Sequence, residues 1–494
     1  MVTSPHFESH WAPGSFWPHM PSSYSGDIRQ ICRQSERCSG LRNEVRRRLR
    51  KEHLTQVYAD VVGQTANLDD GDLEALGFAP GILSCFVRPT DPNSFKYKPT
   101  VSGFRLLPES AKHPVKHLRL QIPESGESVA IGLKLLRDLL LGLDPAITLT
   151  VLVKPGVDRD RMANLIRRWG SEPTRVRLVE HRCQTLFAQD NGKTGVLADG
   201  TPALMLPRAT DGRRNGDTLS AQKLSSLLGL PILSSKLYWE GGNVLFDGHT
   251  CLIGAQTIAQ NVTRFGLSER QVKEAFKLEF GAKILVLGDM KSALESARAD
   301  EENDKADSSQ RGQADFHIDL DLCVLGQLAA RTHSPVVAIA DPLMGAQYRG
   351  AILRCQELFE HHFLPAKDMQ YYFRQILQAT IERRVPLLEA YAKTLKAAGY
   401  ALVGIPDIRL APELNYLARI NMSFNYCNVL PVASHSARPV VYLFHYGIHA
   451  LDKAVDKVYR SCGLRPIAIS GDVTTAHELL LLRGGLHCLC AKMG

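Results

Sequence analysis

The 494-residue sequence predicts an α/β protein. Short β-branched and aliphatic runs alternate with segments of helical periodicity from about residue 117 onward, which is typical of α/β folds. Hydrophobic residues make up 44% and charged residues 22% of the chain, which suits a globular protein with one large core or two to three domains. The richest apolar run, residues 133–147, is interrupted by charges such as Lys134 and Asp144, so no membrane-spanning segment is expected.

The first elements of the alternating region are marked by β-branched runs and by amphipathic periodicity. We expect strands at residues 118–122, 147–153 and 176–179, and helices at residues 130–142 and 158–169. Farther along, a strand at 204–206 leads to a helix that ends near Leu228, and a helix at 268–280 precedes a strand at 283–287. Strands at 336–340 and 401–405 flank a long helical region at 347–398.

Residues 1–114 are predicted to be an N-terminal extension, partly disordered, that precedes an α/β domain at residues 115–494. The extension begins with a segment rich in Pro, Ser, His and aromatic residues that lacks the order of a secretory signal. Its basic run, residues 46–51, is interpreted as a solvated helix face rather than a nucleic-acid site. A polar insertion at 298–315 is expected to be a mobile surface loop, either covering a site or incidental.

Charge and cysteine content limit the classes of partner. A formal net charge of +8 over this length is interpreted as ordinary solubility charge, so neither nucleic acid nor a membrane is expected as a partner. The eleven cysteines form no C-x-x-C pair and have no histidine at zinc-ligand spacing. These features favour free thiols in the cytoplasm and argue against a structural metal site. The sequence is compatible with a homo-oligomer as well as with a monomer.

Four short polar motifs carry the candidate chemistry. They are residues 187–192 (Phe-Ala-Gln-Asp-Asn-Gly), 239–245 (Trp-Glu-Gly-Gly-Asn-Val-Leu), 316–320 (Phe-His-Ile-Asp-Leu) and 483–490 (Arg-Gly-Gly-Leu-His-Cys-Leu-Cys). Singly, each has an ordinary structural explanation: a turn, a bend, a solvated strand face, or a buried cysteine. In His317-Ile318-Asp319, strand alternation would place both polar side chains on one face.

Together and in this order, the motifs resemble the guanidine-modifying (pentein) superfamily, and agmatine deiminases most closely. The superfamily also includes peptidylarginine deiminase-type hydrolases and amidinotransferases. The segment 423–429 is similar to the strand that precedes the last module of these enzymes. The resemblance covers residues 115–494 and implies repeated βαβ-like units in a pseudo-fivefold α/β propeller. The chain departs from the pattern at Gln189, where relatives usually carry arginine, and at Asn243, where some carry aspartate or serine.

The resemblance implies a cysteine-dependent reaction. Cys488 is the expected nucleophile, because the delocalised guanidinium carbon is a poor electrophile that needs a thiolate. His317 is expected to protonate departing ammonia and then to activate water, and Glu240 to hold the imidazole protonated and oriented. The four glycines at 241, 242, 484 and 485 are expected to let the backbone pass close to the substrate.

Carboxylates are the groups that recognise a guanidinium, because each can accept two parallel N–H donors from the planar cation. Asp190 and Asp319 are therefore the expected substrate ligands, together with Asn243. The expected product is a ureido compound plus ammonia, formed from a small guanidino substrate such as agmatine, free arginine or a methylated arginine, and the expected reaction needs no metal or organic cofactor. Protein-bound arginine is also open.

Three alternatives remain. An amidinotransferase would use the same Cys488 and His317 but pass the amidino group to an amine. A Cys/His protease is disfavoured by the three carboxylates around the nucleophile. An inactive pentein that serves as a binding protein would keep the fold without turnover. The second thiol, Cys490, is either a core residue or the partner of a regulatory disulfide with Cys488.

Overall fold

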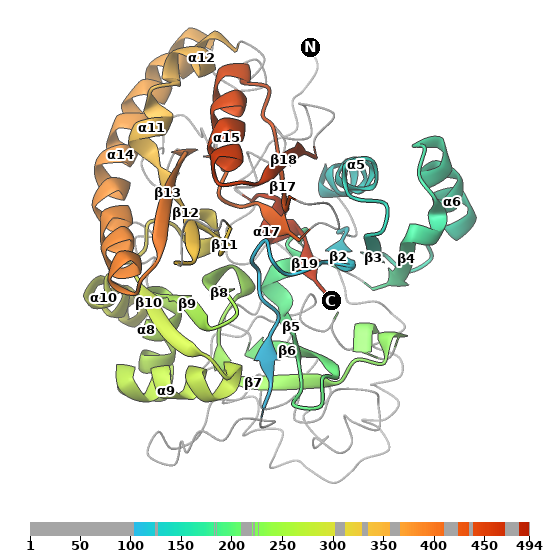
Figure 1. The fold of residues 1–494 in the computed structure, drawn as a ribbon, viewed down its shortest axis with the longest axis horizontal. Coiled ribbons are helices and arrows are strands. Elements are labelled where there is room, and N and C mark those ends of the chain that lie inside the picture. Colours follow the sequence, from blue (N-terminus) through green and yellow to red (C-terminus); the bar gives the residue numbers. More distant parts are fainter. Residues whose placement is uncertain are drawn as a thin grey trace. The chain divides into compact units, whose positions relative to one another are not determined.

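The computed structural model (Figure 1) describes residues 103–493 with gaps at 124–126, 182, 184, 209–219, 221–222, 226, 302–311, 329–333, 356–365, 410–422, 434–437 and 470–483. All described residues fall within one compact unit that comprises residues 89–208 and 216–494. The basic run at 46–51 and the rest of residues 1–102 lie outside the described residues. In the described parts of the chain, no helix is long and apolar enough to cross a membrane.

The described strands form several small sheets rather than one large one, and none of these sheets closes on itself. One sheet has the order β19-β2-β3-β4, in which three parallel strands are joined through helices and the C-terminal strand pairs antiparallel with β2. Its elements are β2 (His117–Gln121), α5 (Glu127–Gly142), β3 (Thr148–Val153), α6 (Arg159–Arg168), β4 (Val176–Glu180) and β19 (Ala491–Lys492). A crossover helix is what a parallel strand pair requires.

The next two sheets have the orders β1-β5-β6-β7 and β10-β9-β8. The strands of the first are β1 (Arg105–Leu106), β5 (Lys193–Val196), β6 (Pro202–Arg208) and β7 (Ile232–Tyr238). The second consists of β8 (Val244–Phe246), β9 (Thr250–Gly254) and β10 (Lys283–Leu287), with α8 (Ala255–Phe265), α9 (Glu269–Phe280) and α10 (Met290–Glu301). Helix α9 begins at a capping box between Ser268 and Gln271 and ends at Gly281, whose left-handed conformation suits glycine.

The remaining sheets follow in chain order. One contains β11 (Leu322–Gly326), β12 (Val336–Asp341) and β13 (Ala401–Pro406), with α11 (Pro342–Ala346), α12 (Arg349–Arg354) and α14 (Ala366–Ala397). A two-stranded sheet pairs β14 (Ile408–Arg409) with β15 (Ser423–Phe424). The last contains β16 (Leu430–Val432), β17 (Val440–Leu443) and β18 (Arg465–Ala468), with α15 (His449–Ser461).

One pairing pattern recurs five times among the described strands. In each case a central strand has an antiparallel neighbour on one side and a parallel neighbour on the other. The five triplets are β5-β6-β7, β8-β9-β10, β11-β12-β13, β16-β17-β18 and β19-β2-β3. The repetition means that one small unit is used several times along the chain.

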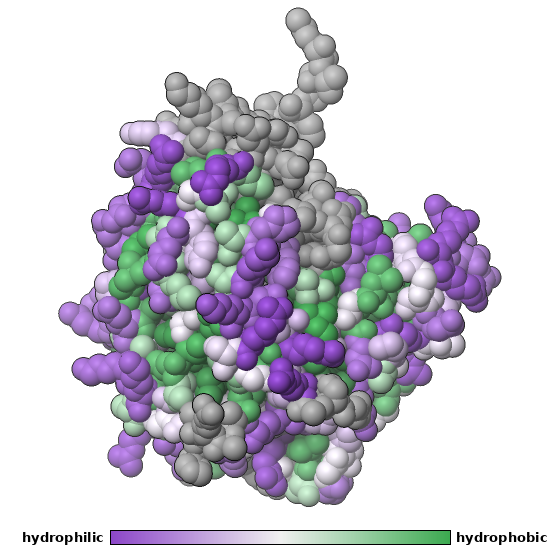
Figure 2. All heavy atoms as spheres, turned by 45° about the horizontal axis from the view of Figure 1, so that its top comes forward, coloured by the Kyte–Doolittle hydropathy of each residue, from purple (hydrophilic) through white to green (hydrophobic). Residues whose placement is uncertain are grey.

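Hydrophobic burial holds these units together. The largest core cluster is continuous from the β2-β3 sheet to the β16-β17 sheet and includes Leu139, Leu149, Val337 and Leu443, all fully buried. A second cluster, centred on Trp239, Phe276 and Phe280, lies between the β8-β9-β10 sheet and its helices. On the face that Figure 2 displays, hydrophilic and hydrophobic residues are interspersed, as on most folded proteins.

Most predicted strands and helices are confirmed with their ends shifted by a few residues. The long helical region at 347–398 is divided into α12 and α14, with residues 356–365 between them outside the described part. The helix expected to end near Leu228 is present at residues 223–225 and 227–228. Residues 103–114, assigned to the extension, pack with the sheets: β1 pairs with β5, and Leu107 N–H donates to the Thr194 carbonyl at 3.0 Å.

Two local predictions are wrong. The insertion at 298–315 is not a loop throughout, because α10 continues to Glu301 and residues Gln313 and Ala314 are buried. Polar residues can pack when their hydrogen bonds are met, and the Gln313 side chain bonds to Asn243 and to the Gln256 backbone. His317-Ile318-Asp319 does not form a strand either: His317 precedes the 3-10 turn η8 (Ile318–Leu320).

Candidate active site

Five short turns meet around Cys488, and each lies directly before the first strand of one of the five repeated triplets. They are η4 (Ala188–Asn191) before β5, η6 (Gly241–Asn243) before β8, η8 before β11, residues 425–429 before β16, and α17 (Leu486–Leu489) before β19. Turn η4 contacts η6, η6 contacts η8, and α17 contacts both η4 and η6. The fold thus brings corresponding positions of the repeats together, although they span about 300 residues of sequence.

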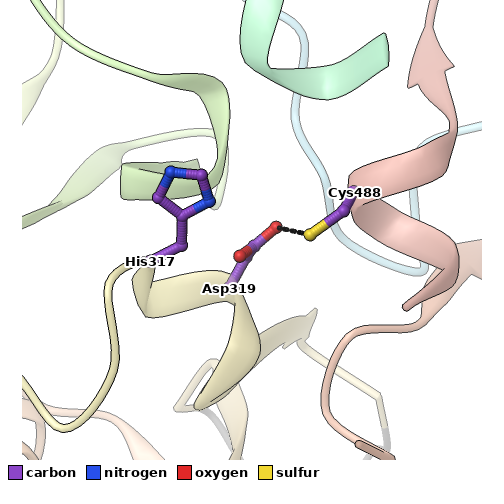
Figure 3. Close-up of side chains that lie close together, drawn as sticks. All are labelled: His317, Asp319 and Cys488. Carbon is purple, nitrogen blue, oxygen red and sulfur yellow. Dashed lines mark hydrogen bonds between the residues drawn. The ribbon is translucent and has the colours of Figure 1, made fainter. Parts of the chain in front are cut away.

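Cys488, Asp319 and His317 form the centre of this cluster (Figure 3). The Cys488 thiol donates to Asp319 Oδ2 at 3.3 Å, and one ligand atom from each of the three residues lies within 4.8 Å of the others. All three side chains are almost completely buried. The same three groups could coordinate a metal ion, so a metal-free site stays a prediction.

His317 lies between two carboxylates. Its Nε2 is 2.6 Å from Glu240 Oε2, and its Nδ1 is 3.7 Å from Asp190 Oδ1. Burial alone would lower the pKa of the imidazole, but the charges of Asp190 and Glu240 outweigh burial and raise this pKa to about 9. His317 is therefore protonated at neutral pH and can donate a proton.

The surroundings of Cys488 disfavour the charged, thiolate form of its side chain. Burial and then the negative charges of Asp319 and Asp190 raise the pKa of the thiol well above its ordinary value. Asn428 holds the residue in place: its Nδ2 donates to Sγ at 3.0 Å, and its Oδ1 accepts the Cys488 N–H at 3.0 Å. In the empty site the buried thiol therefore stays protonated at neutral pH.

Several polar atoms that face the cluster have no hydrogen-bond partner among the described residues. They include His317 Nδ1 and Asp319 Oδ1, both buried. Leaving buried polar groups unsatisfied is costly, and such groups in a native structure often mark a ligand's position. Asp319 Oδ1 is an acceptor for an N–H donor, and Nδ1 of the protonated imidazole is a donor.

The turn that carries Asp190 is fixed from the neighbouring strand β2, even though Gln189 departs from the arginine that the resemblance leads us to expect there. The guanidinium of Arg119 donates to the Ala188 carbonyl, and Asn191 Nδ2 donates to Gln121 Oε1 at 3.0 Å. Gln189 itself donates to Glu109 Oε1 at 2.9 Å. The departure at Gln189 thus leaves the turn anchored.

A buried ion network supports the His317–Asp319 turn from behind. Arg409 donates to Asp315 Oδ2 at 2.9 Å, to Asp407 Oδ1 at 2.9 Å, and to the Leu320 carbonyl. Arg384 of α14 donates to Asp321 Oδ1 at 2.7 Å and also to Asp407. Because Asp315 and Asp321 lie on either side of the turn, the two arginines hold both of its ends.

Asn243 and the glycines have different surroundings from those that the sequence suggested. The Asn243 side chain donates to the Phe316 carbonyl at 3.0 Å and accepts the Ile318 N–H at 3.2 Å, so it holds the neighbouring turn. A Cβ at Gly242 would lie 2.5 Å from His317 Nδ1 and 2.9 Å from Asp319 Oδ1. A glycine is therefore needed at this position because the His317 and Asp319 side chains pack against it.

The sequence interpretation missed three residues that the structure brings to the cluster: Asn428, His487 and Glu109. Asn428 lies in the segment 423–429, which was noted only as a strand. His487 was visible as the neighbour of Cys488 in the fourth motif, but it was given no role. Glu109 had no signal at all, because it lies in the part assigned to the extension, and contacts between residues far apart in sequence, such as the pairing of β1 with β5, bring that part to the site.

No protein-family model matches this sequence, and no curated protein matches it either. Among solved structures, a provisionally assigned agmatine deiminase matches with a TM-score of 0.51 and 14% identity, covering 80% of this chain and 97% of its own. The agmatine deiminase of Enterococcus faecalis matches at 0.46 and 14% identity over 79% and 95%. A dimethylarginine dimethylaminohydrolase variant with S-methyl-L-thiocitrulline matches at 0.30 and 11% identity over 76% and 99%.

The first of these likenesses shows the fold. The chain shares a mixed α/β fold with the provisionally assigned agmatine deiminase, and agmatine deiminases are the enzymes that the four motifs resemble most closely. At 14% identity the likeness shows the fold alone. The chemistry therefore has to be argued from this chain's own residues.

Proposed function

We propose that this protein hydrolyses a guanidino compound to a ureido product and ammonia, with Cys488 as the nucleophile. One observation carries the proposal. A buried cysteine, a protonated histidine and the carboxylates of Asp190, Asp319 and Glu240 gather at one point of a fold that guanidine-modifying enzymes share. Excess negative charge around a thiol is a poor setting for most acyl-transfer chemistry, but it suits a cationic substrate.

In the proposed binding step, the guanidinium lies between the Asp190 and Asp319 carboxylates. Asp319 Oδ1 supports this assignment, because it is buried and has no hydrogen-bond partner among the described residues. The substrate's positive charge offsets the carboxylates that raise the thiol pKa, so the cation itself promotes loss of the Cys488 proton to solvent. The Asn243 side chain acts indirectly, by holding the Phe316–Ile318 backbone.

In the proposed chemical steps, the Cys488 thiolate attacks the guanidinium carbon and forms a C–S bond. The protonated His317 gives its proton to the departing nitrogen, the C–N bond breaks, and ammonia is released. The cysteine then carries an S-alkylthiouronium group. The neutral His317 then takes a proton from water, and the resulting hydroxide attacks the same carbon. Collapse of this adduct breaks the C–S bond, returns the thiolate and releases the ureido product, while the hydroxyl proton of the adduct passes to solvent.

We infer that residues 115–494, together with the packed segment 103–114, form the pentein domain, with its repeated units in pseudo-fivefold order around a polar centre. The five recurrent strand triplets, each preceded by a turn of the site, support this arrangement. We also infer a cytoplasmic location with no cofactor and a small guanidino substrate. The described cysteines, including Cys488 and Cys490, are free thiols, which supports a reducing compartment.

Purified protein incubated with agmatine, arginine, methylated arginine and a peptidyl-arginine tests the proposal by release of ammonia and ureido product. Cys488→Ala should lower turnover on the order of a million-fold if the cysteine and histidine act as a unit. Cys490→Ala is the matched control, because Cys490 is equally buried; it should retain most of the activity.

Each outcome of this panel has a clear meaning. Ammonia formed with a single substrate and no added amine supports a hydrolase. Turnover that requires an added amine supports the amidinotransferase alternative. Near-native activity of Cys488→Ala overturns the mechanism, and the absence of turnover with every compound favours a binding protein.

A further inference from the structure

His487, the residue before the proposed nucleophile, is held between two carboxylates. Its Nδ1 is 2.8 Å from Asp319 Oδ2, and its Nε2 is 3.2 Å from Glu109 Oε1. The side chain is buried, and Gln189 Nε2 lies 3.4 Å from its Nε2. With a carboxylate at each ring nitrogen, only the doubly protonated imidazole donates to both.

The Glu109 side chain is held in place by several contacts, so it can fix the position of the His487 ring. Its Oε2 accepts the Phe246 N–H at 3.2 Å, its Oε1 forms an ion pair with Lys193, and its backbone N–H donates to the Phe246 carbonyl at 2.8 Å. Burial alone would raise the pKa of this carboxyl, but Lys193 and His487 hold it well below its usual range. The charged side chains therefore alternate in sign in the order Asp319, His487, Glu109, Lys193.

The hydrogen bond between His487 and Asp319 gives the two Asp319 oxygens different surroundings. Oδ2 accepts from His487 Nδ1 and from the Cys488 thiol, while Oδ1 has no hydrogen-bond partner among the described residues. An aspartate with one fixed oxygen cannot rotate freely about its terminal bond. His487 therefore sets the direction in which Oδ1 points.

We propose that His487 is a positioning residue, which keeps Asp319 ionised and turned toward the guanidinium and is itself held charged by Glu109. This inference rests on the proposed function, because it assigns Asp319 to substrate binding. Nothing in the four motifs gave His487 a role. The inference also makes residues 103–114 part of the catalytic unit, because Glu109 comes from that segment.

Two substitutions separate positioning from simple space filling. His487→Asn places an amide N–H near the Nδ1 position, so it keeps a donor to Asp319 but loses the charge and the contact with Glu109. His487→Gln reaches toward Glu109 but loses the donor to Asp319. A lost charge-assisted hydrogen bond corresponds to about a 10- to 100-fold effect, so KM for the guanidino substrate should rise about that much in His487→Gln and less in His487→Asn.

The charge of His487 also predicts a pH effect. Groups that face its ring are Asp319 and Glu109, with Lys193 behind Glu109 and with His317 and Cys488 on the other side of Asp319. In both His487 variants the lost positive charge should raise the Asp319 pKa. The acid limb of the kcat/KM profile should therefore move to higher pH. His445→Asn is the matched control, because His445 also bonds to an aspartate, Asp456 on α15, and should change neither KM nor the profile.

The protonation state of His487 can also be measured by NMR, without turnover. In full-length protein labelled with ¹⁵N-histidine, the signals lost in His487→Asn identify the ring nitrogens of His487. Both should stay protonated at pH 7.5, and Glu109→Gln should lower the pKa of this imidazole. A singly protonated wild-type ring, or equal KM and pH effects of the Asn and Gln variants, would overturn the proposal. If the wild type acts on no guanidino compound, the proposed function fails while the NMR titration still decides the state of His487.

Discussion

At the scale of single residues, the site combines an imidazole and a thiol, His317 and Cys488, whose pKa values are both raised, so both groups are protonated at neutral pH. The same carboxylates cause both effects: Asp190 and Asp319 raise the pKa of His317 and the pKa of Cys488. A thiolate beside a protonated imidazole is thus a minor form of the empty protein. A guanidinium changes this balance because it brings the missing positive charge. We therefore expect a bell-shaped dependence of kcat/KM on pH.

Glu240→Gln tests whether this carboxylate holds the proton on His317. Glu240 helps to raise the His317 pKa to about 9 and bonds to Nε2 at 2.6 Å. Loss of the negative charge should lower this pKa. Because the Cys488 thiol holds its proton more tightly than the imidazole, the His317 pKa sets the acid limb of the profile. That limb should therefore move to lower pH, and the maximal kcat/KM should fall. Rates measured across pH 6 to 10 check this shift, and an unchanged profile would mean that another group holds the imidazole proton.

Asp190→Asn and Asp319→Asn test the guanidinium ligands. An amide of the same shape places N–H donors opposite the N–H donors of the substrate, besides losing the charge. Each change should cost roughly 2–5 kcal/mol of transition-state stabilisation, measured as a drop in kcat/KM. A variant that keeps both kcat and KM within a small factor of the wild type would remove that aspartate from the binding site.

At the scale of elements, the proposed catalytic turns have little support of their own and depend on what lies behind them. Each is only three to five residues long, and η8 is held by Arg384 of α14 and by Arg409 of β14. Burial raises the pKa of Asp321 to about 6 even though Arg409 and Arg384 lower it, so these ion pairs are needed to keep the carboxylate charged.

Arg384→Met should therefore destabilise the protein by about 3–5 kcal/mol, because it leaves Asp321 and Asp407 without one of their two buried cations. Denaturant unfolding measures the change. Arg374→Met is the control: Arg374 lies on the exposed side of the same helix α14, where surface substitutions usually cost within about 0.5 kcal/mol. Equal stability of the two variants would show that the network contributes nothing.

The elements also show where sequence patterns suffice and where they do not. Strands such as β3 and β10, and a helix such as α9 with its capping box, carry their signals within a few adjacent residues. His317-Ile318-Asp319 was wrongly assigned to a strand because three residues are too few to separate alternation from a turn. Gln313 was wrongly placed in a loop, because its partners Asn243 and Gln256 are distant in sequence.

At the scale of the whole molecule, the site exists only because both ends of the described chain return to it. Strand β19 pairs with β2, and Lys492 Nζ donates to the Glu109 carbonyl and to the Pro431 carbonyl at 3.1 Å each. The nucleophile at 488 and the Glu109 segment are thereby fixed to each other across almost 380 residues. The four motifs named six site residues but not Glu109, because a contact of this range leaves no local pattern.

The central claim is that Cys488 forms a covalent bond to the guanidinium carbon. Mass spectrometry of protein quenched in acid during turnover tests it directly, on the peptide that contains Cys488. The account predicts an added mass equal to the substrate less ammonia. In His317→Ala this adduct should persist if it forms, because its hydrolysis lacks a base. Steady turnover with no adduct on that peptide, together with an active Cys488→Ala variant, would contradict the account.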